Sequence, residues 1–351
     1  MSIIKLLNNN KRIELLSRKD LYIVTGFFVF ILGILLYIFF TPNYYKYPSP
    51  VRIDINRGET LNELIDSLYN KKIIPSKSNM KIISHLFNYD RKIRAGRYFI
   101  PNGLSYIKLL NIFTGSNSRY TQILITLPEG ISQSYLASII QKNINVDSAK
   151  IMELSADASF INTLGLEVKN LEGYLLPETY YIYQDNNAEE ILRRLKLQMD
   201  KIFTPEIEIR MKLLKMTRNE ILTLASIING ESTYIPEFKT ISGVYYNRLK
   251  KGMLLQADPT IEYLIRNRES NKITLKDLQI NSKFNTYKYE GLPPSPINNP
   301  GKDAILAALF PEKHKYLYFV ADGKGEHIFS ATYEQHQINV TKYRKWLKNQ
   351  Y

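Results

Sequence analysis

The sequence predicts an α+β protein in which a single N-terminal transmembrane helix is followed by a small α/β module and a larger mixed α+β domain. Three observations support this prediction. An uncharged apolar stretch covers residues 21–40, short strand and helix patterns alternate over residues 51–117, and longer amphipathic helices are mixed with strands over residues 118–351. A chain of 351 residues is long enough to form two domains with separate cores.

The stretch LYIVTGFFVFILGILLYIFF (21–40) contains no charged residue and matches the ~20 apolar residues that cross a bilayer. A signal peptide has a shorter apolar region and small residues at its cleavage site, whereas Thr41 and Pro42 follow here. We therefore expect an uncleaved anchor. Five Lys and Arg residues precede it and three lie in the twenty residues after it, which predicts a cytoplasmic tail at residues 1–20 and extracytoplasmic domains beyond the membrane.

A short linker with prolines, residues 41–50, leads into the small module at residues 51–117. A strand is expected at 51–55, and Thr60 with Glu63 forms a capping box that begins a helix. A second helix, a second strand with its turn, and a third helix are expected at 78–87, 96–103 and 104–115. This strand–helix–helix–strand order resembles LysM modules, small domains that bind polymers of N-acetylglucosamine.

The larger domain is expected to begin with a strand and turn at 121–130 and a helix at 132–141. Two helical runs follow at 188–203 and 206–216. Thr217 and Glu220 form a second capping box and begin a helix of about four turns that ends near Glu231. The chain closes with a hairpin within 316–332 and a final helix that contains Trp346.

The formal net charge of +14 is compatible with nucleic acid, anionic lipid or an acidic polymer as a partner. The Lys and Arg residues are spread over the whole chain, and no zinc-finger or phosphate-loop pattern accompanies them, so nucleic-acid binding is discounted. There is no cysteine, which excludes disulfide and thiol chemistry. The four histidines lack the spacing of metal ligands, and no nucleophile elbow is present, so carboxylates are left as the catalytic candidates.

Glu231 stands where a core residue is expected. Leu224, Ile227 and Ile228 lie on one apolar helix face, and the next position on that face is 231, directly after Gly230. Loss of water there would raise the pKa of the carboxyl and keep it protonated near neutral pH, as general acid catalysis requires. The alternative interpretation is that Gly230 ends the helix and Glu231 faces solvent.

Two segments after Glu231, residues 243–263 and 284–301, are rich in amides, hydroxyls and aromatic rings, and we expect both to form rigid loops. The residues singled out in them are Asn247, Arg248, Gln256, Asp258, Asn285, Thr286 and Tyr287. Amides and hydroxyls pair with the hydroxyl groups of sugars, and a proline-rich loop loses little entropy when it binds. The two segments therefore predict a sugar-binding cleft.

Five stretches of the sequence resemble the successive motifs of the endolytic murein transglycosylases, the MltG or YceG-like family. They are LEGYLLPETY (171–180), ASIINGES (225–232), YNRLKKGMLLQADPT (246–260), NTYKYEGLPPSPINNPG (285–301) and YLYFVADGKGEHIFS (316–330). The resemblance extends from the apolar N-terminal stretch to the C-terminus, and it implies that residues 118–351 form a YceG-like catalytic domain.

The resemblance implies a single-pass protein of the bacterial inner membrane that cuts nascent peptidoglycan inside its glycan strands. Such a lytic transglycosylase breaks the β-1,4 bond after N-acetylmuramic acid and leaves a 1,6-anhydromuramic acid end. By motif match the catalytic glutamate is Glu231, which would protonate the leaving oxygen and then accept the proton of the sugar's own C6 hydroxyl. Neither a metal nor a cofactor is implied.

Six further residues are expected to act on the substrate. Candidates for positioning the sugars are Asn247, Gln256, Asn285 and Tyr287. Candidates for stabilising the positive charge of the transition state are Asp258 and Glu172. One departure from the family pattern concerns Asn229 and Gly230, which stand where relatives often carry an acid and a larger residue.

Two other interpretations fit the same residues. In the first, Glu231 pairs with Asp258 or Glu172 and the enzyme is a hydrolase that uses water and leaves reducing ends. In the second, the protein is a non-catalytic scaffold of cell-wall synthesis that binds glycan. The expected partners are peptidoglycan glycan strands, the inner membrane and, through the resemblance, peptidoglycan synthases.

Overall fold

The computed structural model describes residues 18–56, 58–89, 93–114, 121–144, 146–268 and 272–348. The chain divides into two compact units, Met1–Gln122 and Ile123–Tyr351. Most of the predicted cytoplasmic tail and the predicted boundary at residues 117 and 118 lie outside the described residues. The fold is mixed α+β, as the sequence predicts.

Helix α1 (Arg18–Phe40) opens the described part of the chain. Its segment Leu21–Phe40 has a mean hydropathy of 2.7, which makes the helix long and apolar enough to cross a membrane. The side chains of this segment are almost all exposed, as expected for a helix that has no protein core around it. By length and composition it fits either a single-pass anchor or a signal sequence.

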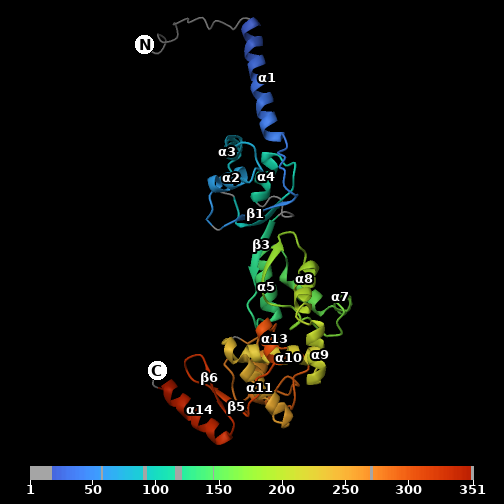
Figure 1. Cartoon of the computed structure of the whole chain (residues 1–351), viewed down its shortest axis with the longest axis vertical. Coiled ribbons are helices and arrows are strands. Elements are labelled where there is room, and N and C mark those ends of the chain that lie inside the picture. The colour runs from blue at the N-terminus through green and yellow to red at the C-terminus, as the bar shows by residue number, and fades with distance from the viewer. Residues whose placement is uncertain are drawn as a thin grey trace, which may run out of the picture. The chain divides into compact units, whose positions relative to one another are not determined.

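The first unit is built on an antiparallel strand pair covered by three helices (Figure 1). In chain order its elements are β1 (Val51–Ile55), α2 (Leu61–Asn70), α3 (Lys77–Leu86), β2 (Gly96–Ile100) and α4 (Tyr106–Phe113). Ile53 of β1 pairs with Tyr98 of β2, and both side chains are fully buried. The predicted capping box is present, because Glu63 donates its backbone N–H to Thr60 and accepts from the Thr60 N–H in return.

The second unit contains a short strand pair, a set of packed helices and a C-terminal hairpin. Its first elements are β3 (Thr121–Thr126, which begins in the first unit), α5 (Gln133–Asn143), α6 (Ser148–Ala156), α7 (Ala158–Thr163), β4 (Thr179–Tyr183), α8 (Ala188–Asp200) and α9 (Pro205–Leu214). They are followed by α10 (Arg218–Glu231), α11 (Phe238–Lys250), α12 (Asp258–Ile265), α13 (Lys302–Leu309), β5 (Tyr318–Ala321), β6 (His327–Ser330) and α14 (Tyr333–Lys348).

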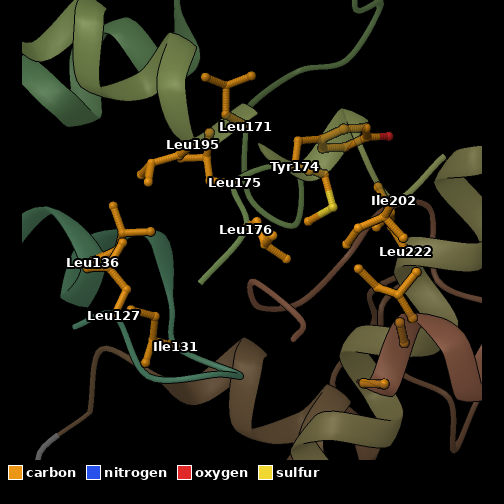
Figure 2. Close-up of a cluster of buried hydrophobic side chains, with 14 of the residues drawn as sticks. Leu127, Ile131, Leu136, Leu171, Tyr174, Leu175, Leu176, Leu195, Ile202 and Leu222 are labelled. Carbon is orange, nitrogen blue, oxygen red and sulfur yellow. The ribbon is translucent and has the colours of Figure 1, made fainter. Parts of the chain in front are cut away.

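The core of the second unit joins segments that are far apart in the sequence. Figure 2 shows Leu136 of α5, Leu195 of α8 and Leu222 of α10 around the segment that contains Leu175, and all four side chains are fully buried. Full burial of one leucine contributes about 2 kcal/mol of hydrophobic stabilisation. This packing fixes α10, because its inner residues from Ile221 to Ile228 are all buried in that core.

The hairpin and the last helix form one end of the second unit. Strands β5 and β6 pair antiparallel, with Phe319 opposite Phe329, and α14 packs along both strands (Figure 1). The ring of Trp346 on α14 covers Gly323 in the hairpin turn, where a Cβ atom would lie 2.5 Å from the ring. The predicted hairpin and final helix are therefore both present.

The prediction that residues 243–263 form a loop is wrong for most of the segment. Helix α11 covers Phe238–Lys250 and α12 covers Asp258–Ile265, which leaves only residues 251–257 as a connection. Asn247 and Arg248 therefore stand on a helix. The helix contains Gly243, whose lack of a side chain admits the backbone oxygen of Glu312, and this packing outweighs the low helix propensity of glycine.

Candidate active site

Glu231 is the last residue of α10, and the helix is positioned by both its start and its core-facing residues. The predicted capping box is formed, since Thr217 accepts from the backbone N–H of Glu220 and Glu220 accepts from the backbone N–H of Thr217. Leu224, Ile227 and Ile228 have no exposed surface. The helix therefore does not end at Gly230, and its apolar face carries the Glu231 carboxyl to a partly buried position.

The environment of Glu231 favours its protonated form. Burial raises the pKa of the carboxyl from 4.5 to about 8, and the nearby charges of Asp258 and Glu262 act in the same direction. Arg248 and the hydrogen bond from Tyr245 oppose this rise without cancelling it. Within the described residues Glu231 forms no ion pair, and the guanidinium of the nearby Arg248 donates to backbone oxygens instead of to the carboxyl.

Helix α11 brings two side chains to Glu231. Tyr245 is 1% exposed, and its hydroxyl donates a 2.5 Å hydrogen bond to Oε1 of Glu231. Arg248 lies one turn further along α11 and donates to the backbone oxygens of Leu317 at 2.6 Å and Leu255 at 2.7 Å. Arg248 thereby ties the residue before β5 and the α11–α12 connection to the helix that holds Tyr245.

Gly230 allows α12 to approach the end of α10. A Cβ atom at this position would lie 2.6 Å from Cβ of Pro259, too close for any larger residue without a shift of α12. Asn229, the other departure from the family pattern, accepts a hydrogen bond of 2.9 Å from the backbone N–H of Gly301. An acid at position 229 could accept the same bond, so the asparagine keeps this structural contact.

Asp258 and Tyr287 lie together beside Glu231. The Tyr287 hydroxyl donates a hydrogen bond to Asp258, and the charge of Asp258 raises the pKa of Glu231. The two segments are joined through Thr286, which accepts from the backbone N–H of Ala257 at 2.9 Å and shares a hydrogen bond of 2.9 Å with Thr260. Burial and the neighbouring Asp258 raise the pKa of Tyr287 well above its usual value.

Gln256 precedes this pair and has an unusual backbone. Its φ of 48° lies in the left-handed region, which costs a residue with a side chain about 1 kcal/mol. Its backbone N–H donates to Thr286 at 3.0 Å, and its side chain is exposed. The Gln256 side-chain amide has no hydrogen-bond partner in the part of the chain that the structure describes, and a strained residue of this kind beside a catalytic candidate fits a substrate contact.

The structure does not bring Asn247, Asn285 and Glu172 into this cluster as free side chains. Asn247 donates to the backbone oxygens of His314 at 2.9 Å and Tyr316 at 3.0 Å. Asn285 is fully buried and donates to two backbone oxygens of its own loop, at 3.0 and 2.8 Å. Both amides therefore hold the loops that form the site.

Glu172 is 3% exposed and engaged in a buried network. It accepts from the Arg266 guanidinium at 2.8 and 3.0 Å and from the backbone N–H of Gln133 at 3.0 Å. Arg266 and the backbone of Gln133 both donate hydrogen bonds to its carboxyl. This environment fits a structural anion between α5 and α12.

Two cavities adjoin the end of α10. The first, of about 690 Å³, extends from Glu231 and Ser232 to the hairpin and to Trp346 of α14. The second, of about 430 Å³, lies toward α12 and includes Ser132, Glu262 and Asn298 in its lining. Gly230 and Thr233 line both cavities, so the two meet at the end of α10, beside Glu231.

Sequence reasoning missed Tyr245, Glu129, Glu262 and the lining of the first cavity by the hairpin and α14. The spacing of Ile241, Val244, Tyr245 and Arg248 is a helical pattern that could have placed Tyr245 and Arg248 on one face. No comparable signal exists for the cavity residues, because they come from segments that only the fold brings together.

A carboxyl whose pKa is raised to about 8, placed where two open cavities meet, has the environment that general acid catalysis on an extended polar ligand requires. Comparison with known protein families is consistent with a site of this kind. The model of the YceG-like family matches residues 53–342, and the chain belongs to that family.

Named relatives support the assignment. A protein of Bacillus subtilis (strain 168) named endolytic murein transglycosylase is 32% identical over 312 residues, which cover 84% of this chain and 85% of that protein. A protein of the same name from Streptococcus pneumoniae (strain D39) is 29% identical over 84% of this chain and 58% of its own length. The crystal structure of a YceG-like protein from Listeria monocytogenes has a TM-score of 0.61 at 30% identity, covering 83% of this chain and 99% of that one.

Proposed function

We propose that this protein is a peptidoglycan lytic transglycosylase that cuts glycan strands internally and leaves 1,6-anhydromuramic acid ends. The observation that carries the proposal is Glu231, whose pKa of about 8 keeps it protonated beside two cavities. The relatives named endolytic murein transglycosylase identify the polymer. Cavities on two sides of the acid suit a strand that continues in both directions from the bond to be cut.

In the proposed reaction, Glu231 gives its proton to the oxygen that links N-acetylmuramic acid to N-acetylglucosamine. The bond from C1 to that oxygen breaks, its electron pair stays on the oxygen, and positive charge develops at C1. The C6 hydroxyl of the same sugar then bonds to C1 and returns its proton to Glu231. The acid is restored, no water is consumed, and an intramolecular nucleophile needs no second catalytic carboxylate.

Tyr245 fixes which oxygen of Glu231 carries the proton. Because its hydroxyl donates to Oε1, the acid proton is placed on Oε2. After proton transfer the same hydrogen bond stabilises the carboxylate until it accepts the C6 proton. Tyr245 is thus proposed as a positioning residue.

Asp258, Tyr287 and Gln256 are proposed to act on the sugars. The carboxylate of Asp258 lies close enough to Glu231 to affect its pKa, and it would stabilise positive charge at C1. Tyr287 orients Asp258 through their hydrogen bond. The exposed amide of Gln256 would pair with sugar hydroxyls.

Helix α1 is proposed to anchor the enzyme in the inner membrane as a single pass, with residues 1–20 in the cytoplasm. Residues 41–50 would link the anchor to a LysM-like module at 51–117, and the catalytic domain would follow at 118–351. The βααβ order of β1, α2, α3 and β2 supports the LysM-like interpretation. Peptidoglycan synthases are the proposed protein partners.

The full-length protein in detergent, as wild type and Glu231→Gln, tests the proposal on uncrosslinked peptidoglycan with mass spectrometry of the products. Glu208→Gln, at an exposed position on α9, is a matched control. Anhydro-ended fragments from the wild type and the control, and none from Glu231→Gln, are expected. Reducing ends would show a hydrolase instead. No cutting by any variant, where a known lytic enzyme cuts, would favour the scaffold.

A further inference from the structure

The second cavity has a negative lining whose carboxyls take no direct part in the proposed reaction. Glu129, from the loop between β3 and α5, and Glu262, on α12, both line it. Neither side chain forms an ion pair or a hydrogen bond within the described residues. Burial raises the pKa of both carboxyls, and neighbouring acids raise them further, Asp303 for Glu129 and Asp258 for Glu262.

The cation in the lining is already neutralised. Arg266 lines the cavity, but its guanidinium is paired with the buried Glu172 at 2.8 Å. The two free carboxyls therefore give the cavity a net negative charge, although the whole chain carries +14. This local excess of acid is the reverse of the general charge of the protein.

Asn298 contributes a side-chain oxygen that accepts no hydrogen bond from the described residues. Its side chain is 7% exposed and lines the same cavity, and its Nδ2 donates to the backbone oxygen of Ser226 at 2.8 Å. Its Oδ1 has no hydrogen-bond partner within the described residues. A buried acceptor without a partner is unfavourable, and a ligand that donates hydrogen bonds would correct it.

We propose that this cavity binds a primary ammonium group carried by the peptide part of the murein strand. The inference rests on the proposed function, because the strand must lie along the end of α10. An ammonium group brings three N–H donors and a positive charge, which match two carboxyls and one unpaired amide oxygen. Among the described residues there is no group of three potential metal-ligating side chains, so an ammonium group fits this lining better than a metal ion.

Crosslinking of murein converts such an amine into an amide and removes its charge. The cavity would then lose its cationic ligand, and the strand would bind less tightly. Glu129 and Glu262 would in this way make the enzyme select strands whose peptides are not yet crosslinked. The selection would operate next to Glu231, since both cavities share Gly230 and Thr233.

Binding of two strands to the full-length Glu231→Gln protein tests the proposal without any need for cleavage. One strand carries free amines on its peptides, and the other is identical except that the amines are acetylated. We expect the free-amine strand to bind about tenfold more tightly, as for one charge-assisted hydrogen bond. Added Glu129→Gln and Glu262→Gln substitutions should remove the preference, whereas added Glu208→Gln should keep it.

Equal affinities of the two strands for the protein without the added substitutions would overturn the proposal, as would a preference that survives both added substitutions. If the affinity for the acetylated strand is unchanged by the added substitutions, the altered cavity is still folded. If the protein with both Glu129→Gln and Glu262→Gln does not fold, the single Glu262→Gln substitution is used in its place. Failure of the proposed function appears separately, as absence of anhydro ends from the wild type. A preference in binding without cleavage would therefore support the cavity and contradict the reaction.

Discussion

Glu231 and Glu172 are two glutamates of the second unit, and their surroundings differ in whether a cation is hydrogen-bonded to the carboxyl. Glu172 is paired with the guanidinium of Arg266 and a backbone N–H, whereas Glu231 has a tyrosine hydroxyl and two neighbouring acids. A cation is hydrogen-bonded to Glu172, whereas the cation near Glu231, Arg248, makes no such bond and only partly offsets the effect of burial on the pKa of Glu231. Burial of a carboxyl that has no cation hydrogen-bonded to it therefore keeps the proton that a general acid needs.

The largest expected effect separates the two glutamates by activity. Glu231→Gln removes the transferable proton and should lower the rate of cleavage by about 10³-fold. Glu172→Gln should change the rate constant of the folded enzyme by less than about tenfold, because it does not touch the reacting atoms. Rates of anhydro-end formation, corrected for the folded fraction, provide the measurement, and equal losses in the two variants would remove the distinction.

The effects on stability should be reversed. Glu172→Gln leaves Arg266 without its partner and should lower the free energy of unfolding by about 2 kcal/mol, less than for a fully buried pair because Arg266 is 39% exposed. Because the pKa of Glu231 rises from 4.5 unfolded to about 8 folded, the native state holds more protons in this window, and wild-type stability falls as the pH rises through it.

Glu231→Gln removes this pH dependence, so its advantage in thermal stability over the wild type should be greatest above pH 8 and smallest near pH 4.5. Thermal unfolding of the wild type, Glu172→Gln and Glu231→Gln across the pH range tests both expectations, the loss of stability in Glu172→Gln and the advantage of Glu231→Gln at high pH. A Glu172→Gln protein as stable as the wild type would show that the Arg266 pair contributes nothing.

Tyr245→Phe is expected to reduce the turnover number about tenfold with little change in KM, because it removes a bond that orients Glu231 without contacting the sugars. Since the hydrogen bond from Tyr245 lowers the pKa of Glu231, its loss should also move the alkaline limb of the pH–rate profile upward. A purely structural role would reduce the amount of folded enzyme and leave that limb in place.

Gln256→Gly should give the smallest effect. Glycine adopts the left-handed φ of 48° without strain, so the variant should be as stable as the wild type or slightly more so. KM should rise about threefold if the amide holds one sugar hydroxyl. An unchanged KM would remove Gln256 from the substrate contacts.

The sequence predicts the local parts of this site well. The capping box at Thr217 and the spacing of Leu224, Ile227 and Ile228 are local signals, and they define α10 and the place of Glu231 at its end. Helix α11 was missed because Gly243 and its aromatic residues have low helix propensity, and packing against distant segments stabilises it.

The partners of polar side chains could not be predicted from the sequence. An asparagine in a loop is equally suited to a sugar and to a backbone carbonyl, and only the fold shows that Asn285 and Asn247 bond to carbonyls. For Glu172, the decisive neighbour Arg266 lies 94 residues further along the chain. The pairing of a carboxyl with a cation thus depends on the tertiary structure, and a sequence motif does not show it.

The proposed reaction requires that Glu231 retain its proton near neutral pH. Infrared difference spectroscopy of the full-length protein, wild type against Glu231→Gln, measures this directly as the band of a protonated carboxyl during a pH titration. The structure predicts a band that belongs to Glu231, is present at neutral pH and disappears with a pKa of about 8. A band that is lost near the ordinary value of 4.5 would contradict the account, because Glu231 would then be a carboxylate with no proton to give.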